Sequence, residues 1–148
     1  MFLRRPDSHL GLANFMRSHL YASLATLKIG LDILLKEEDV KIDSITGHGG
    51  LFKTKGVGQS ILAAAMNAPI SVMETAGEGG AWGMALLAAY MLSKKDGQSL
   101  GDYLDSRVFA ERKSETMEPD LADVAGFETY TKQYQACLAA EKAAVQAF

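Results

Sequence analysis

Apolar residues recur every three or four positions near both ends of the chain. Over residues 12–35 they form one stripe: Leu12, Met16, Leu20, Leu24, Leu27, Leu31 and Leu34. This spacing is that of an α-helix with one face turned toward a core. We therefore predict a long core-packing helix there. From about Asp123, a second stripe predicts a final helix through Val124, Phe127, Tyr134, Leu138 and Val145.

Two short segments have the pattern of β-strands. Residues 41–46 alternate apolar and polar side chains, and residues 70–74 are rich in β-branched positions. A glycine-rich turn and a helical pattern follow each of them, with the helices expected over residues 59–66 and 81–91. This repeated order of strand, turn and helix predicts an α/β fold, with parallel strands covered by long helices.

Local signals refine the boundaries of these elements. Asn67 can adopt the left-handed conformation that ends a helix, and Pro69 prevents the helix from continuing. Ser99 is a suitable N-cap for a short helix over residues 99–104. The polar stretch over residues 107–122 predicts an irregular surface connection.

Length and composition set the class of protein. The 148 residues correspond to one domain, residues 1–148, and the formal charge of −3 excludes a generally basic nucleic-acid surface. No apolar run reaches the roughly 18 residues of a membrane span. The single cysteine, Cys137, cannot form an internal disulfide, and we expect a cytoplasmic protein with a half-buried, inert thiol.

The glycine turns are the best candidates for ligand contact. In the first turn, Gly47-His48-Gly49-Gly50, backbone N–H groups can approach an anion or a flat ring because no β-carbon intervenes. The following helix would point its N-terminus at the same place. The turn is neither a P-loop nor a strict dinucleotide fingerprint. Glycines that serve only to make tight turns remain the alternative interpretation.

Catalytic constellations are scarce. His9, His19 and His48 are not spaced as a metal site, and no nucleophile elbow is present. Glu74 and Glu78 are the acidic residues closest to a turn, but solvated loop positions explain them better. Trp82 could stack on an adenine or lie in the core, and Gly80 and Gly83 suggest a closely packed helix. We predict no catalytic residue and no metal ligand.

Three segments in order resemble the FGGY carbohydrate kinases. Residues 46–50 with 59–64 resemble the family's glycine-rich adenosine motif and its helix, and residues 78–88 resemble the second glycine motif. Residues 12–20 are similar to the start of the long helix in the C-terminal signature. The resemblance covers about residues 12–92 and is greatest to the xylulokinase-like group.

The resemblance implies a fold and an activity. FGGY kinases transfer the γ-phosphoryl group of ATP, with Mg²⁺, to a sugar hydroxyl in a cleft between two actin-like (ribonuclease H-like) lobes. This chain would be most of the C-terminal, nucleotide-side lobe. The residues that would bind ATP or ADP all lie in the first turn and just after it: Gly47, His48, Gly49, Gly50, Leu51, Phe52 and Thr54. Gly80, Ala81 and Gly83 would match packing positions of the next helix.

The chain also departs from the family pattern. The loop over residues 50–59 is longer and carries Lys53 and Lys55, and Ala64 stands where many members have Asp. The N-terminal lobe, with the sugar contacts and the catalytic Asp, has no counterpart, and the opening strands are missing. We therefore expect a partial lobe, inactive alone, that forms a homodimer through exposed edges and contacts neither nucleic acid nor membrane.

Two other classes of function stay open. The chain could be a standalone interaction or regulatory domain that keeps the kinase fold without its catalysis. A dinucleotide-binding oxidoreductase fragment is also compatible with the glycine turns, but it rests on them alone.

Overall fold

The computed structural model describes residues 2–74, 76–110 and 114–147. It shows a mixed α/β protein with a three-stranded sheet and long helices. The chain forms two compact units. One comprises Met1–Asp43, Ser60–Ala68 and Glu118–Phe148, and the other comprises Ser44–Gln59 and Pro69–Met117.

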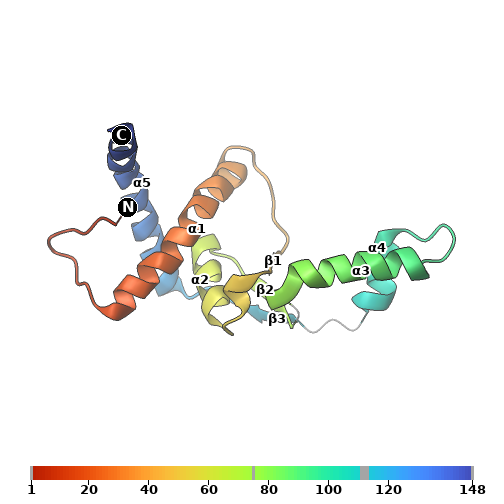
Figure 1. Ribbon diagram of the computed structural model, residues 1–148. Coiled ribbons are helices and arrows are strands. Elements are labelled where there is room, and N and C mark those ends of the chain that lie inside the picture. The colour runs from red at the N-terminus through yellow and green to blue at the C-terminus, as the bar shows by residue number, and fades with distance from the viewer. Residues whose placement is uncertain (1, 75, 111–113, 148) are drawn as a thin grey trace. The chain divides into compact units, whose positions relative to one another are not determined.

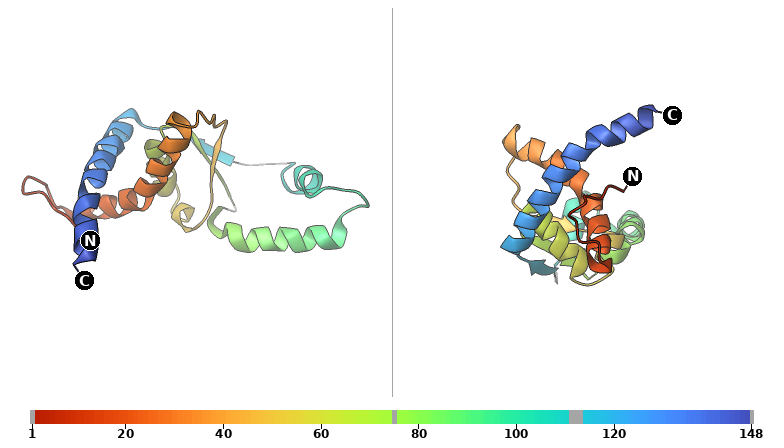
Figure 2. Two further views of the ribbon diagram at one scale, coloured as in Figure 1. Left: turned by 90° about the horizontal axis from the view of Figure 1, so that it is seen from above. Right: turned by 90° about the vertical axis from the view of Figure 1, so that its left-hand side faces the viewer.

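The first unit is helical. Helix α1, Leu12–Lys36, packs against α5, Leu121–Gln146, and Figures 1 and 2 show the two helices crossing. The rings of Tyr21 and Phe127 meet with centroids 4.7 Å apart, and both side chains are buried. Most of α2, Val57–Met66, also belongs to this unit, and its residues 62–66 are buried. The Asp120 carboxylate caps α5.

The predicted helices are confirmed, but the prediction that the apolar stripe of α1 faces a core is wrong for most of the helix. Of that stripe only Leu24 is buried, whereas Leu12 is 78% exposed and Met16 is 54% exposed. The buried residues of α1 are instead Tyr21, Leu24 and Ala25, because the contacts with α5 gather around Tyr21. In α5, Leu138 and Val145 are likewise exposed.

The second unit contains the sheet, in the order β1–β2–β3. Strand β1, Ile45–Gly47, runs parallel to β2, Ile70–Met73, with Ile45 opposite Ile70. The predicted parallel pair is therefore confirmed, although β1 is shorter than expected because residues 41–44 are not part of the strand.

We expected an irregular connection over residues 107–122, but part of it, Ser114–Met117, forms strand β3. It pairs antiparallel with β2, while residues 111–113 lie outside the described part of the chain. The buried Gln59 side chain holds the two strands together, since its Nε2 donates to the carbonyls of Ile70 and Glu115 at 2.7 and 2.8 Å. Helix α5 then begins two residues before the predicted start.

Helix α3, Gly79–Ser93, follows β2 and a 3-10 turn over residues 76–78. We expected its glycines to press against a neighbour, and this is wrong: a β-carbon built at Gly80 or Gly83 meets nothing within 4 Å. No residue of α3 is buried, although the helix is apolar throughout.

Two predicted helix ends are confirmed. Asn67 ends α2 with a φ of 49°. The Ser99 hydroxyl caps α4, Leu100–Tyr103, by accepting from the Asp102 N–H at 3.1 Å. A π-helical turn, Leu104–Val108, follows α4. Among the described residues, no helix is both long and apolar enough to cross a membrane.

Candidate functional site

The two glycine turns lie side by side in the second unit. They follow β1 and β2, and the carboxyl ends of parallel strands lie at the same edge of a sheet. The N–H of Gly49, in the first turn, donates to the carbonyl of Ala76, in the second, at 2.7 Å. The His48 side chain rests on Gly79, where an added β-carbon would stand 3.3 Å from Nδ1. The repeated strand–turn–helix pattern therefore produces one site from two turns.

The first turn needs glycine for conformation and for close approach. Gly49 has a φ of 105°, which L side chains rarely adopt. Gly47 lies directly beneath the ring of Phe52, and a β-carbon there would overlap it. Gly58, at the start of α2, approaches the backbone carbonyl of Leu51 in the same way. These contacts fix the path of the backbone from β1 to α2.

An apolar pocket of about 630 Å³ lies beside the two turns. His48 and Gly49 of the first turn line it, together with three glycines at the N-terminal end of α3: Gly79, Gly80 and Gly83. Trp82 and Phe109 add aromatic surface, with ring centroids 5.9 Å apart. Leucine and methionine side chains form most of the remaining wall. A pocket of this size and composition suits a flat, partly apolar ligand.

A second, more polar pocket of about 350 Å³ lies on the same unit. Its lining includes Phe52, Thr54, Lys55, Glu74 and Glu115. Part of its polar surface is already paired, because Lys55 Nζ lies 3.0 Å from Glu115 Oε2.

The seven residues predicted to contact nucleotide do not all line the same pocket. His48 and Gly49 line the larger pocket, whereas Phe52 and Thr54 line the smaller one. Gly47 is buried beneath Phe52, and Gly50 and Leu51 line neither pocket.

Sequence reasoning missed most of the wall of the larger pocket, including Gly79 and Phe109. Gly79 could have been found, because its turn repeats the first strand–turn–helix pattern. Phe109 had no such signal, since it lies in a polar stretch without periodicity.

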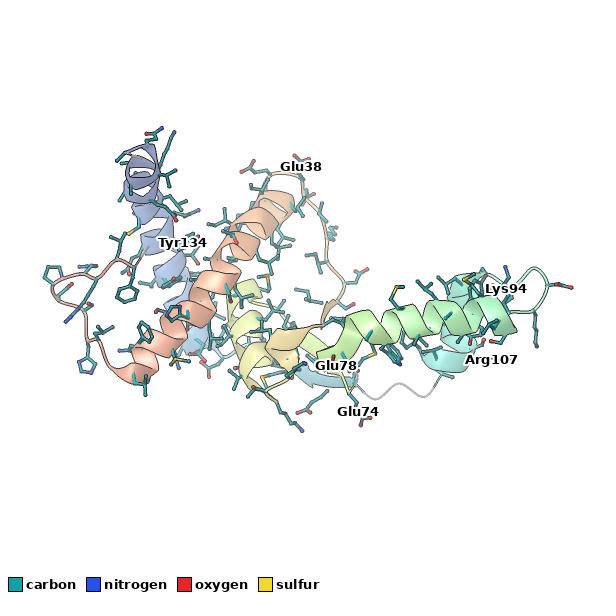
Figure 3. All side chains as sticks on the ribbon, viewed as in Figure 1. Glu38, Glu74, Glu78, Lys94, Arg107 and Tyr134 are labelled. Atoms are coloured by element: carbon teal, nitrogen blue, oxygen red, sulfur yellow. The ribbon has the colours of Figure 1, made fainter. Side chains whose placement is uncertain are left out.

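Both lysines of the loop over residues 50–59 form ion pairs. Lys53 Nζ lies 2.6 Å from Glu78 Oε1. This ion pair joins the loop after the first turn to the residue before α3. Both side chains are mostly exposed, so the pair contributes at most about 1 kcal/mol. Glu78 and Glu74 both lie near the start of α3, as Figure 3 shows.

Among the described residues, no group of three or more His, Cys, Asp or Glu side chains could hold a metal ion.

The fold is that of an α/β domain with a pocket at the carboxyl edge of its parallel strands. Residues 2–92 match the model of the FGGY family of carbohydrate kinases, C-terminal domain. The chain therefore belongs to this family, and its α/β fold is consistent with the ribonuclease H-like lobe of these enzymes. Neither curated proteins nor solved structures give a match.

Proposed function

We propose that this chain forms the nucleotide-binding side of an ATP-dependent sugar kinase. Membership in the FGGY family makes it part of a carbohydrate kinase, and such kinases generally use ATP and Mg²⁺. The finer assignment, a pentulose acceptor of the xylulose type, rests on the resemblance of about residues 12–92 to the xylulokinase-like group within the family. In this proposal, residues 1–148 form most of the C-terminal lobe.

The contact between His48 and Gly79 beside the apolar pocket carries the proposal. It brings both glycine turns to one place, where His48 and Gly49 of the first turn and the start of α3 line the same pocket. The adenosine would enter the larger pocket along His48, Gly49 and Trp82. The rest of the first turn, Gly47, Gly50, Leu51, Phe52 and Thr54, would shape the backbone and the rim.

We assign the parts that transfer a phosphoryl group to the rest of the enzyme rather than to this chain. Transfer requires an oriented acceptor hydroxyl and stabilisation of the phosphoryl charge. The described residues do not fit a dedicated magnesium site, and Glu78 near the pocket is already paired with Lys53. We therefore assign nucleotide binding to this chain, and the sugar contacts and catalytic base to the N-terminal lobe of the family's enzymes. This chain alone would bind nucleotide without turnover.

A cytoplasmic setting fits this role. The lone cysteine, Cys137, is free and half-buried, and such thiols are typical of reducing compartments. ATP and ADP would be its small-molecule partners.

Fluorescence titration tests the nucleotide site, because Trp82 is the sole tryptophan and lines the pocket. We expect a saturable change in Trp82 emission with ATP or ADP. Gly80→Leu should abolish the change, since Gly80 lines the pocket, a β-carbon there meets nothing within 4 Å, and the larger side chain would fill part of the space. The control Ala89→Leu adds the same side chain at an exposed position of α3 that does not line the pocket. No response at millimolar nucleotide, or an equal loss in both variants, would contradict the proposal.

A further inference from the structure

Helix α3 carries an apolar surface that the second unit leaves open. Met84, Met91 and Leu92 are 70%, 76% and 90% exposed. No charged residue occurs between Gly79 and Ser93, so a partner could cover this surface without burying a charge. Such a surface is typical of an interaction site.

Four of the exposed residues of α3 have the spacing of an antiparallel helix pair. Ala81, Met84, Ala88 and Met91 are all exposed and stand at intervals of three, four and three, which places them on one face. The pattern is symmetric about Leu86. In an antiparallel pair of identical helices centred there, Met84 of each copy meets Ala88 of the other, and Met91 meets Ala81. Each large side chain therefore faces a small one.

The charges at the two ends of α3 obey the same symmetry. Glu78 precedes the helix and Lys94 follows it, each eight positions from Leu86. Figure 3 shows these two residues at opposite ends of α3. An antiparallel pair therefore sets Glu78 of each copy near Lys94 of the other, whereas a parallel pair would bring like charges together. Within one copy, Lys53 Nζ lies 2.6 Å from Glu78 Oε1, and Lys94 Nζ lies 5.3 Å from the ring centroid of Tyr90 on its own helix.

We propose that α3 is a dimer interface, and that its partner is α3 of a second copy in antiparallel orientation. The small side chains Ala81 and Ala88 allow the two backbones to approach closely. The interface is separate from the proposed nucleotide pocket except at Met84, which lines both.

The mass of the full chain in solution tests this proposal. Light scattering or sedimentation over a range of concentrations should show a monomer–dimer equilibrium. Met91→Glu, which does not touch the pocket, should raise the dimer dissociation constant by at least about tenfold because it buries charge against a second copy. The matched control Leu121→Glu changes an equally exposed apolar residue on α5 and should leave the constant unchanged.

Cysteine cross-linking tests the orientation. In a Cys137→Ser background, Ala81→Cys and Met91→Cys combined should give a disulfide-linked dimer, whereas either change alone should not. Residues 81 and 91 are about 15 Å apart along the helix, so a disulfide within one helix is excluded.

Three results would overturn the proposal. They are a monomer at every concentration, an equal effect of Met91→Glu and Leu121→Glu, and cross-linking by a single cysteine, which indicates a parallel pair. Binding of a monomeric chain to phosphatidylcholine vesicles through α3 would likewise assign the face to a membrane. None of these results depends on nucleotide binding, so the two proposals can fail separately.

Discussion

His48 and Gly79 belong to turns separated by thirty residues, yet the imidazole of one rests on the backbone of the other. A β-carbon at Gly79 would stand 3.3 Å from Nδ1 and 3.5 Å from the β-carbon of His48. The contact lies on the wall of the larger pocket, which both residues line. A larger side chain at residue 79 would therefore press on His48.

Gly79→Ala tests this coupling. The added methyl group forces the His48 side chain to move by a few tenths of an ångström, and we expect nucleotide affinity to fall several-fold. Adding His48→Ala removes the side chain that obstructs the methyl group. A double-mutant cycle on the dissociation constant should therefore show a favourable coupling of about 0.5–1 kcal/mol. Strictly additive effects would mean that the two turns act independently.

Gly58, at the start of α2, should tolerate substitution far less well than Gly83 in α3. Gly58→Ala brings a β-carbon onto the carbonyl of Leu51, and because backbone cannot easily yield, we expect the free energy of unfolding to fall by about 1–3 kcal/mol. The matched Gly83→Ala has open space in a helix and should raise it by about 0.5–1 kcal/mol. Urea denaturation measures both. Equal effects would contradict the close approach at Gly58.

Gln59 should be essential for strand β3. Gln59→Leu keeps a side chain of similar size but leaves the carbonyls of Ile70 and Glu115 without their amide donor. We expect a loss of about 1–3 kcal/mol in the free energy of unfolding, with faster amide exchange in β3. Ser71→Ala removes the exposed hydroxyl contact to Thr116 in the same strand pair and should cost at most about 1 kcal/mol. A Gln59 variant as stable as wild type would refute this assignment.

Asp32 in α1 should make stability depend on pH. Burial alone would raise its pKa, but hydrogen bonds and charge from Lys28 and Lys36, at 2.6 and 3.0 Å, lower the pKa below its usual value. A carboxylate whose pKa is lower in the folded state stabilises the fold above its unfolded pKa of about 3.9, and this contribution is lost as the pH falls.

Asp32→Asn measures that contribution. At about 0.3–0.5 kcal/mol per pair, the variant should be less stable than wild type by up to about 1 kcal/mol at pH 7 and low salt. The difference should shrink as the pH falls below the unfolded pKa and approach zero once the carboxyl group is protonated in the folded state as well. A difference that is independent of pH would show that the carboxylate charge is not the cause.

Periodicity was enough to predict the helices and the parallel strand pair, because each has a strong local signal. It could not locate the core of α1, since burial depends on where α5 crosses it, and Tyr21 rather than Met16 lies there. Strand β3 was missed because Ser-Glu-Thr-Met has no apolar alternation and is held by pairing with β2 and by Gln59. The site was found only in part, because Phe109 reaches the pocket through tertiary contacts.

Hydrogen–deuterium exchange of the full chain with and without ATP tests the central claim most directly. We expect slower exchange in two separate segments, residues 47–54 and 77–83, with no change in α5. In Gly80→Leu this protection should disappear, whereas in Ala89→Leu it should remain. Protection confined to one turn, or found mainly outside both, would contradict a nucleotide site built from the two glycine turns.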